Sequence, residues 1–389
     1  MAEFLELIES FRAEEATIGR LFGGDGMGVR SRARSPQYLK RLADAATFMA
    51  DVYDGRRPMY HLQEEMTTSD FPYLFSDILD RQLLANYQEA PYSWKAYCKR
   101  AVVRDFRQVK RKYLSGGEGT LEQVTESHEY QRAALSDGEY AYQVKKYGWQ
   151  IALSWETLIN DDLDAFRTLP ERLGKAARRT EEKFATELFV GTTGPHASLY
   201  TSGNANIVTS NPALSVAALQ TAMGILLTQT DSDGEPIMVE AMTLAVPPQL
   251  QVTAFNILNA VQIWAKTSGG GASAQEIVVG NWIKNAGIVQ AVTNFYIPQV
   301  ASSSNGATSW FLFADPNNGR PALELGFLRG HEDPEVFIKA PNAVRAGGGA
   351  ADPLAGDFDT DSVEYKVRHV FGGARMDPKM TCASNGSGS

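Results

Sequence analysis

Two β-rich stretches joined by a polar segment are the feature that most constrains the fold of this chain of 389 residues. Residues 101–113 and 140–147 are rich in β-branched and aromatic side chains, which indicates two strands of one hairpin. Between them lie the glycines of Ser115–Gly119 and an acidic stretch. Neither face of residues 101–113 is cleanly apolar, and an isolated two-stranded hairpin is only marginally stable in water. The sequence therefore predicts a long arm that must lie on another surface.

The charges along this arm are segregated in the sequence. Residues 95–112 hold eight basic side chains against one acidic, a balance of +7, and residues 115–139 hold six acidic against one basic, a balance of −5. A basic stem with an acidic tip suits head-to-tail docking between copies of the chain, because complementary charges steer and register an interface. A solvated hairpin and a DNA-binding stem are equally compatible with this pattern. If copies dock, the candidate interface residues are Arg104, Arg107, Lys110, Arg111, Lys112, Glu118, Glu122 and Glu126.

The composition excludes several broad classes of protein. Hydrophobic residues make up 43% of the chain and charged residues 21%, which excludes intrinsic disorder as the overall state. The length suffices for two or three domains with a core of their own. A net charge of −9 argues against a general nucleic-acid binder, whose phosphate contacts need a basic surface. The two cysteines, Cys98 and Cys382, give neither a disulfide framework nor a metal knuckle, so we expect a reducing compartment.

Residues 1–18 are acidic and amphipathic and do not have the basic leader and apolar run of a signal peptide. No stretch reaches the roughly 18–20 apolar residues that span a bilayer. We therefore expect a soluble protein without membrane contact that is made and used in the cytoplasm.

Apolar residues at spacings of three and four predict a main helix over residues 169–190, about 30 Å long. We expect Pro170 in its first turn, where a proline is tolerated, after a short turn that ends at Thr168. Shorter helices are predicted over residues 4–18 and 36–52, after Asp70, from 212 or 215 to 227, and from 247 to 257. Strands are predicted over residues 242–246, 289–297, 310–314, 323–328 and 363–370, followed by a frayed tail over 384–389.

No constellation of residues supports catalysis, so we predict no enzyme activity, no cofactor, and no catalytic or metal-binding residue. The five histidines form no HxH or HExxH pair, and no Gly-x-Ser-x-Gly motif occurs. Cys98 has no histidine signature beside it and is interpreted as an inert thiol. The sequence Asp231–Glu235 contains part of a calcium loop, but the remaining ligands are missing, which favours a surface turn.

The order of these parts resembles that of the major capsid proteins of tailed bacteriophages, which have the Hong Kong 97-like fold. Residues 141–162 resemble the stretch in which the family's extended loop returns and its spine helix begins. Residues 234–258, with Thr243–Leu250 at their centre, are similar to the strand, double-proline turn and helix of the axial domain. Residues 364–377, with Val367–Gly373, resemble the closing strand of the peripheral domain. The likeness covers most of the chain from about residue 94 onward.

The resemblance implies an α+β fold with an N-terminal arm, an extended β-hairpin loop, a peripheral domain with a long spine helix, and an axial domain. The implied segments are an N-terminal arm with leading helices (1–93), the extended loop with flanking strands (94–155), the peripheral domain (156–210), the axial domain (211–345), and a return to the peripheral domain with the C-terminal tail (346–389). The resemblance also implies that residues 102–144 of the hairpin arm are the extended loop, which lies across a neighbouring subunit.

The resemblance also implies the function. The chain is expected to assemble into pentamers and hexamers of an icosahedral shell, through a procapsid that matures, around packaged double-stranded DNA that it does not read by sequence. The virion is then its location, after assembly in the host's cytoplasm. Residues 1–60 are too short and too mixed for the family's cleavable scaffolding segment. A separate scaffolding protein is therefore expected as a partner, beside portal and decoration proteins. Some relatives join a loop lysine to an asparagine of a neighbour, but no motif here identifies that pair.

Two alternatives remain open from the sequence. An encapsulin-type nanocompartment has the same fold and encloses a protein cargo instead of a genome. A DNA-binding protein or an enzyme of another fold would show salt-dependent DNA affinity or an active site.

Overall fold

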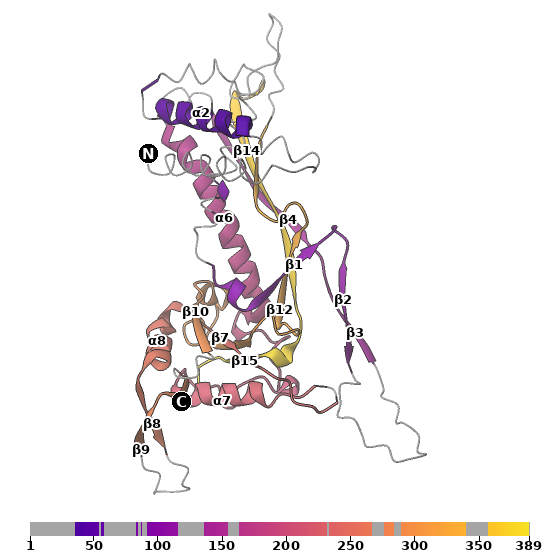
Figure 1. Ribbon diagram of the computed structural model, residues 1–389, viewed down its shortest axis with the longest axis vertical. Helices are drawn as coiled ribbons and strands as arrows, with labels where there is room; N and C mark the ends of the chain where they lie inside the picture. Colours follow the sequence, from indigo (N-terminus) through magenta and orange to yellow (C-terminus); the bar gives the residue numbers. More distant parts are fainter. Residues whose placement is uncertain are drawn as a thin grey trace, which may run out of the picture. The chain divides into compact units, whose positions relative to one another are not determined.

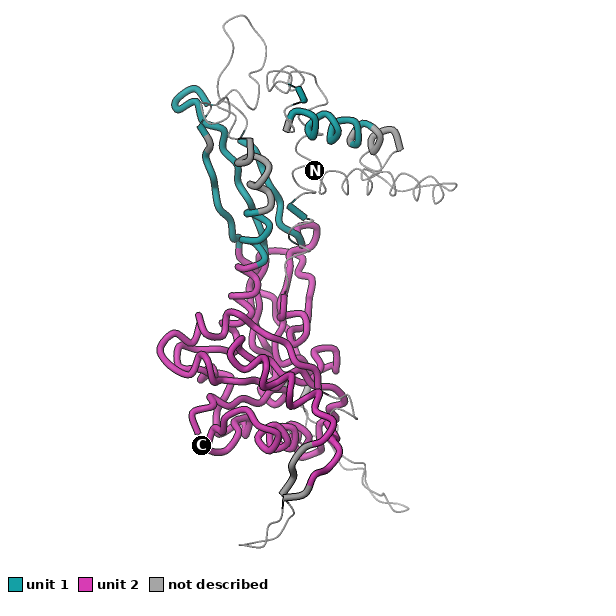
Figure 2. Tube along the Cα trace, turned by 90° about the vertical axis from the view of Figure 1, so that its left-hand side faces the viewer, with its two compact units in different colours: residues 1–91, 146–178, 333–370 teal, residues 92–145, 179–332, 371–389 magenta. Residues whose placement is uncertain are grey.

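The computed structural model describes the helices and strands of most of the chain (Figure 1). The described residues are 36–53, 56–57, 83–84, 87, 92–115, 136–154, 163–231, 233–266, 276–283, 289–339 and 357–388. The chain forms two compact units (Figure 2), unit 1 with residues 1–91, 146–178 and 333–370, and unit 2 with residues 92–145, 179–332 and 371–389. The long helix α6 (Leu163–Phe189) and the long strand β14 (Ser362–Arg375) each contribute residues to both units.

Unit 1 contains helix α2 (Pro36–Tyr53), which confirms the helix predicted over residues 36–52. Its sheet pairs β13 (Glu335–Ile338) with β14 in antiparallel register, and β4 (Lys145–Ser154) also pairs with β14. Side chains along β14 alternate, because successive residues of a strand point to opposite faces. Over residues 363–368 the buried members are Val363, Tyr365 and Val367, and the other face carries Glu364, Lys366 and Arg368, whereas His369 and Val370 are both buried.

Unit 2 is built around a four-stranded sheet in the order β10 (Val289–Thr293), β7 (Met242–Val246), β11 (Trp310–Ala314) and β15 (Thr381–Ser384). Strands β7 and β11 are buried along their whole length, as expected for continuous apolar runs. Helix α7 (Val216–Leu227) packs against β11 and β15, and α8 (Gln251–Asn259) packs against β10. Phe189 at the end of α6 lies edge-on to Phe311 and Phe313, which forms an aromatic core.

A second sheet region of unit 2 carries the arm. Strand β1 (Cys98–Val103) runs parallel to β12 (Leu323–Leu328), and β12 pairs antiparallel with the last residues of β14. The arm itself is the two-stranded ribbon β2 (Val109–Ser115) and β3 (Ser136–Tyr142), drawn in Figure 1 beside β1. The remaining short elements are η2 (Trp94–Ala96), β5 (Val190–Gly191), β6 (Gly194–Pro195), η3 (Ser202–Asn204), η4 (Pro248–Leu250), β8 (Gln262–Lys266), β9 (Glu276–Gly280), α10 (Ile297–Val300) and η5 (Pro378–Met380).

Several predicted elements are confirmed to the residue. Strands β7, β11 and β12 have the predicted bounds, and α7 begins after Ser215, whose hydroxyl accepts a hydrogen bond from the Ala218 amide. The predicted pairing of the two arm strands is confirmed for residues 109–111 with 140–142. Residues 101–103 pair with β12 instead, and residues 145–147 belong to β4, which pairs with β14. The turn at Asp231 is confirmed, since its carboxylate accepts hydrogen bonds from the amides of Asp233 (2.9 Å) and Glu235 (3.0 Å).

Two predicted elements have different starts or breaks in the structure. Helix α6 begins at Leu163, so that Pro170 lies inside the helix rather than in its first turn. A proline there removes one helical hydrogen bond, and the 27-residue helix forms despite that loss. The strand predicted over residues 101–113 is interrupted at Arg104–Gln108, because the Asp105 carboxylate accepts a hydrogen bond from the Arg107 amide (3.1 Å) and turns the chain.

Three strand and tail bounds also differ. Strand β10 ends at Thr293 because the side chain of Asn294 accepts a hydrogen bond from the Tyr296 amide (2.8 Å). Strand β14 continues to Arg375 because it pairs with β12. The tail is not frayed: Asn211 accepts hydrogen bonds from the amides of Asn385 (3.1 Å) and Gly388 (2.8 Å).

Other predicted elements lie outside the described residues. They are the helix over residues 4–18 and most of the helix after Asp70, of which residues 83–84 and 87 are described and are helical.

Candidate subunit interface

The arm has two chemically different faces. Its register runs from Val109 opposite Tyr142 to Ser115 opposite Ser136, and side chains alternate between the faces along each strand. One face, here called the inner face, carries Arg111, Tyr113, Tyr140 and Tyr142. The outer face carries Lys110, Lys112, Glu139 and Ala141.

The inner face is fastened to the body of unit 2 through Glu324. One carboxylate oxygen, Oε1, accepts a hydrogen bond from the Arg111 guanidinium (2.8 Å) and another from the Tyr142 hydroxyl (2.6 Å). Glu324 lies within β12 and is only 3% exposed. Burial, and then the hydrogen bond to Glu324, raise the pKa of Tyr142, so its hydroxyl keeps its proton and remains a donor. Charge-assisted hydrogen bonds such as that from Arg111 are stronger than neutral ones.

Beside this carboxylate the end of the arm lies on two neighbouring glycines. Gly326 of β12 and Gly372 of β14 are register partners in the sheet. A methyl group on Gly372 would overlap the Gln143 carbonyl oxygen, and one on Gly326 would meet the Tyr142 hydroxyl. Val144, the next residue of the arm, is buried there. Only a surface without side chains lets the backbone approach so closely.

Further along the inner face, two tyrosines stack. The rings of Tyr113 and Tyr140 are 4.7 Å apart between centroids and inclined by 21°. Burial, and then the charge of Asp377, raise the pKa of Tyr140. Such a pair contributes about 0.5–1.5 kcal/mol beyond its buried area.

The outer face is exposed and charged. Lys110 and Glu139 form an ion pair (Nζ to Oε1, 2.9 Å), and Lys112 lies exposed on the same face. Arg104 and Arg107 are exposed at the bend before β2. The Arg107 Nε atom lies 3.9 Å from Asp105 Oδ2, and the Arg107 side chain is 90% exposed. Glu118, Glu122 and Glu126 lie outside the described residues. The structure thus places Lys110 and Lys112 together and Arg111 on the opposite face.

The charge segregation read from the sequence is partly removed by folding. Asp137 and Glu139 belong to the acidic block of the sequence, but β3 places them opposite Leu114 and Lys112. They are therefore part of the stem, where Glu139 neutralises Lys110.

The segment that leads into β1 is held by a second buried carboxylate, Glu182 of α6. It accepts hydrogen bonds from the amides of Ser93 (3.1 Å) and Trp94 (3.4 Å) and from the Ser93 hydroxyl. Burial raises the pKa of Glu182 in spite of these donors. Its neighbour Glu181 accepts a hydrogen bond from the Trp94 indole (3.2 Å). These contacts fix the segment that leads into β1.

Glu324 and Glu182 were missed by reasoning from the sequence. A signal was present for each: Glu324 interrupts the apolar run Leu323–Leu328, and Glu182 occurs in the amphipathic pattern of α6. A charged residue within an apolar strand or face is rarely buried unless it has a partner. The partners, however, lie far away in the sequence.

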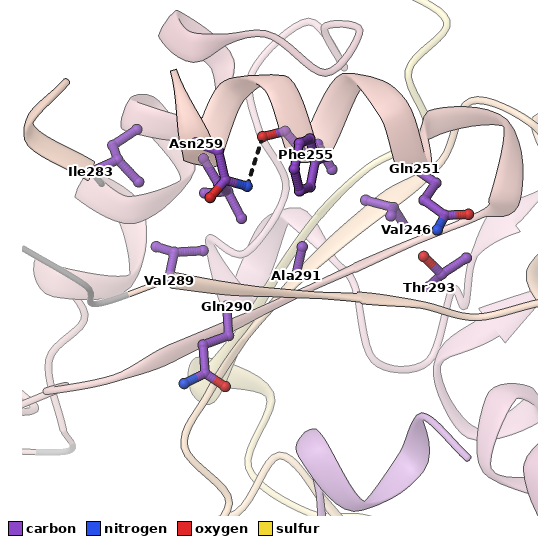
Figure 3. Close-up of a pocket in the computed structure, with 11 residues that line it drawn as sticks. Val246, Gln251, Phe255, Asn259, Ile283, Val289, Gln290, Ala291 and Thr293 are labelled. Carbon is purple, nitrogen blue, oxygen red and sulfur yellow. Dashed lines mark hydrogen bonds between the residues drawn. The ribbon is translucent and has the colours of Figure 1, made fainter. Parts of the chain in front are cut away.

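Cavities lined by the described residues include two in unit 2. One, of about 460 Å³, lies beneath α8, where Phe255 and Val289 project from opposite walls and Asn259 donates to the Phe255 carbonyl (Figure 3). The other, of about 570 Å³, is lined by Lys183, Glu187 and His196 among others. Burial, and then the charge of Arg375, lower the pKa of His196.

Chemically reactive groups are buried or scattered in the described part of the chain. Cys98 and Cys382 are buried free thiols, and burial raises the pKa of both, that of Cys382 to about 12. No group of three or more His, Cys, Asp or Glu side chains that could hold a metal ion occurs among the described residues. Nor is any helix of the described residues long and apolar enough to cross a membrane.

Comparison with known proteins gives one family and a set of structures. A family model described as "Phage capsid protein" matches residues 138–383, from the arm's return strand to β15. No curated protein sequence matches this chain.

Solved structures similar to this chain include the capsid of the cyanophage P-SCSP1u, with 14% identity over 75% of this chain and 87% of that chain and a TM-score of 0.44. A virus-like particle from Pyrococcus furiosus has 11% identity over 80% of this chain and 99% of its own, with a TM-score of 0.43. The Mycobacterium phage Patience structure has 13% identity over 82% and 89% of the two chains, with a TM-score of 0.44.

Proposed function

Because this chain belongs to the family of phage capsid proteins, we propose that it assembles into pentamers and hexamers of an icosahedral shell that encloses packaged double-stranded DNA. The observation that carries the proposal is the family match, which spans more than half of the chain. The expected elements of a Hong Kong 97-like α+β fold are present as well: the two-stranded arm, the long helix, the inserted α/β unit and the return strand. The activity is self-assembly, and the protein has a structural role in the virion.

Within this proposal, the arm's outer face is the contact with a neighbouring subunit. Lys110 and Lys112 lie together on it, and Arg104 and Arg107 extend from the adjacent bend. Exposed cations of this kind steer and register association with an acidic surface. The acidic residues Glu118, Glu122 and Glu126 of the same arm supply the complementary charge on the neighbour. Arg111 is assigned to its own subunit instead, because Glu324 binds it.

The remaining expectations belong to the same proposal. The spine helix is α6, the axial domain covers residues 211–345, and the other segments have bounds 1–93, 94–155, 156–210 and 346–389. A separate scaffolding protein, a portal and decoration proteins are the partners, and assembly takes place in the host's cytoplasm.

Electron microscopy of the full chain, expressed alone and with the scaffolding protein encoded beside it, tests the proposal. We expect closed icosahedral shells or free capsomers. A protein that stays monomeric under all assembly conditions contradicts the proposal. The content of particles isolated from phage-infected or native cells separates the alternatives: double-stranded DNA supports the virion, whereas a protein cargo indicates an encapsulin-type compartment.

The role of the outer face is tested by reversing its exposed cations. The triple variant Arg104→Glu, Arg107→Glu and Lys112→Glu should lower the yield of shells about tenfold without lowering the melting temperature, because these side chains contribute to association rather than to the core. The control reverses Arg179, Lys183 and Arg329, which are exposed cations outside the arm, and so changes the net charge equally. Equal yields from both triple variants would remove the outer face from the interface.

A further inference from the structure

The direction of the arm depends on what holds its two ends to the body of the subunit. The geometry points to Glu324 as a latch that fixes the arm's direction within the unassembled subunit, before any neighbour is met. This inference rests on the proposed function for its consequence in assembly, but the latch itself is a property of one chain. The arm then approaches a neighbour already oriented, and its association does not have to supply the ordering free energy.

The latch holds both strands of the arm at one atom. Arg111 belongs to β2 and Tyr142 to β3, and both donate to the same oxygen of Glu324. A ribbon fastened through only one strand is free to twist about that strand. Fastening both strands fixes the inner face toward the body and the outer face toward solvent, since side chains alternate strictly along each strand.

The glycine surface completes the latch. Gly326 and Gly372, paired across β12 and β14, allow the backbone of Gln143 and Val144 to lie directly on the sheet. The end of β3 is thereby held from below by the sheet and from the side by Glu324. Val144, 1% exposed, contributes the apolar part of this contact.

The other connection of the arm offers little restraint. All five residues of the bend Arg104–Gln108 are exposed, including Phe106. Hydrogen bonds at the bend run from the Arg107 amide to Asp105 and from the Gln143 side chain to the Phe106 carbonyl (2.6 Å), beside the exposed ion pair of Arg107 and Asp105 (3.9 Å). A segment with few buried contacts opens at low free-energy cost. Without the latch, the arm would therefore pivot about this bend.

A carboxylate at this position is best explained by positioning rather than by stability of the sheet. Glu324 stands among apolar neighbours in a strand that is buried along its length. Apolar side chains in place of Glu324 and its two partners would fill the same space at no desolvation cost, and replacing a buried ion pair as a whole in this way is often neutral or stabilising. What an apolar side chain lacks is a directional bond to two particular donors on the arm.

Double electron–electron resonance on unassembled subunits tests the latch. Spin labels are placed on Lys112→Cys in the arm and Val252→Cys on α8, which is 69% exposed, and both positions belong to unit 2. The native thiols Cys98 and Cys382 are buried and do not take the label. In this background we expect one narrow distribution of distances between the two labels. The distribution should become broad in Glu324→Leu and partly broadened in Arg111→Gln.

The matched control is Lys110→Gln, which removes one positive charge from the outer face of the same strand and should keep the narrow distance. Arg111→Gln changes only a half-exposed side chain, so it tests the latch even if Glu324→Leu fails to fold. The inference is overturned if Glu324→Leu keeps the wild-type melting temperature and the same narrow distribution of label distances. It is also overturned if the labelled protein without further substitutions already gives a broad distribution. Because assembly is not part of this measurement, a failure of the latch is distinguishable from a failure to form shells.

Discussion

Two buried carboxylates of unit 2 hold two different segments of the chain. Glu182 holds the segment that leads into β1 and binds neutral donors: two backbone amides and one hydroxyl. Glu324 holds the base of the arm and binds a guanidinium and a phenol that both belong to the arm. Both carboxylates are nearly inaccessible to solvent.

The difference lies in what each carboxylate fastens. Two of the donors of Glu182 are backbone amides of the segment entering β1, so losing the carboxylate leaves buried amides without an acceptor, which destabilises the folded state. The donors of Glu324 are side chains of a projecting ribbon, and Arg111 can reach water when released because it is half-exposed. We therefore expect Glu182 to determine stability and Glu324 to determine the direction of the arm.

The largest effect is expected from Glu182→Ala. It removes the acceptor of the Ser93 and Trp94 amides and should lower the free energy of unfolding by about 3 kcal/mol. Urea denaturation measures this loss. Glu187→Ala, an exposed position of the same helix, is the control and should change the value by no more than about 0.5 kcal/mol. Equal losses would refute the role of Glu182 in holding the segment that leads into β1.

A smaller effect is expected where the arm's end lies on the sheet. Gly372→Ala introduces a methyl group against the backbone of Gln143 and should destabilise the protein by about 2 kcal/mol, the cost of overpacking. Gly224→Ala in α7 meets nothing within 4 Å and should be neutral or stabilise by about 0.5–1 kcal/mol. Thermal melting of both variants checks this pair, and a neutral Gly372→Ala would mean that the arm's end does not rest on the sheet.

Glu182 and Asp357 are expected to change the stability of the protein with pH in opposite directions. Burial raises the pKa of Glu182, so the folded state loses stability as the pH rises from the ordinary glutamate value through the raised one. The opposite case is Asp357 of unit 1, where hydrogen bonds from Thr360, first its hydroxyl and then its amide, lower the pKa to about 2. Its contribution is complete above its ordinary pKa of about 4 and is lost as the pH falls through about 2.

Melting temperatures measured from acid to neutral pH test both signs. In Glu182→Gln, the part of the fall in melting temperature that occurs as the pH rises above about 4 should be absent. In Asp357→Asn, the part of the fall that occurs as the pH drops below about 4 should be absent. Finding both effects on the same side of pH 4 would contradict the assigned environments.

The smallest effect is expected on the arm's outer face. Lys110 and Glu139 are both about half-exposed, and an ion pair of this kind contributes at most about 0.5–1 kcal/mol. A double-mutant cycle of Lys110→Gln and Glu139→Gln should therefore give a coupling energy near zero at physiological salt. A coupling energy as large as the loss in Glu182→Ala would show that this pair holds the arm together.

Much of the fold was predictable because its signals are local. Strands β7, β11 and β12 are uninterrupted apolar runs, and Ser215 is a capping residue at the start of an apolar helix. Pro170 was misplaced because its local penalty was taken to decide the helix start, whereas α6 continues through it. Asp105 was overlooked as a turn former inside a β-rich stretch.

The candidate site was predictable in outline and not in detail. The two strands of the arm and their pairing followed from composition and a glycine-rich connection. Which cations lie on the outer face could not be predicted in this way, since Arg111 and Lys112 are adjacent in sequence and lie on opposite faces of the ribbon. A shift of one residue in register would exchange their roles.

The sequence by itself determined the capsid resemblance, the arm, and most helices and strands, because apolar periodicity, caps and turn residues act over a few neighbouring positions. The tertiary structure decided which charges serve the subunit and which face outward. Arg111 and Glu324 are 213 residues apart, and Asn211 joins a C-terminal tail 174 residues further along the chain. Contacts across such separations depend on how sheets are ordered and paired, and no local pattern of residues encodes that.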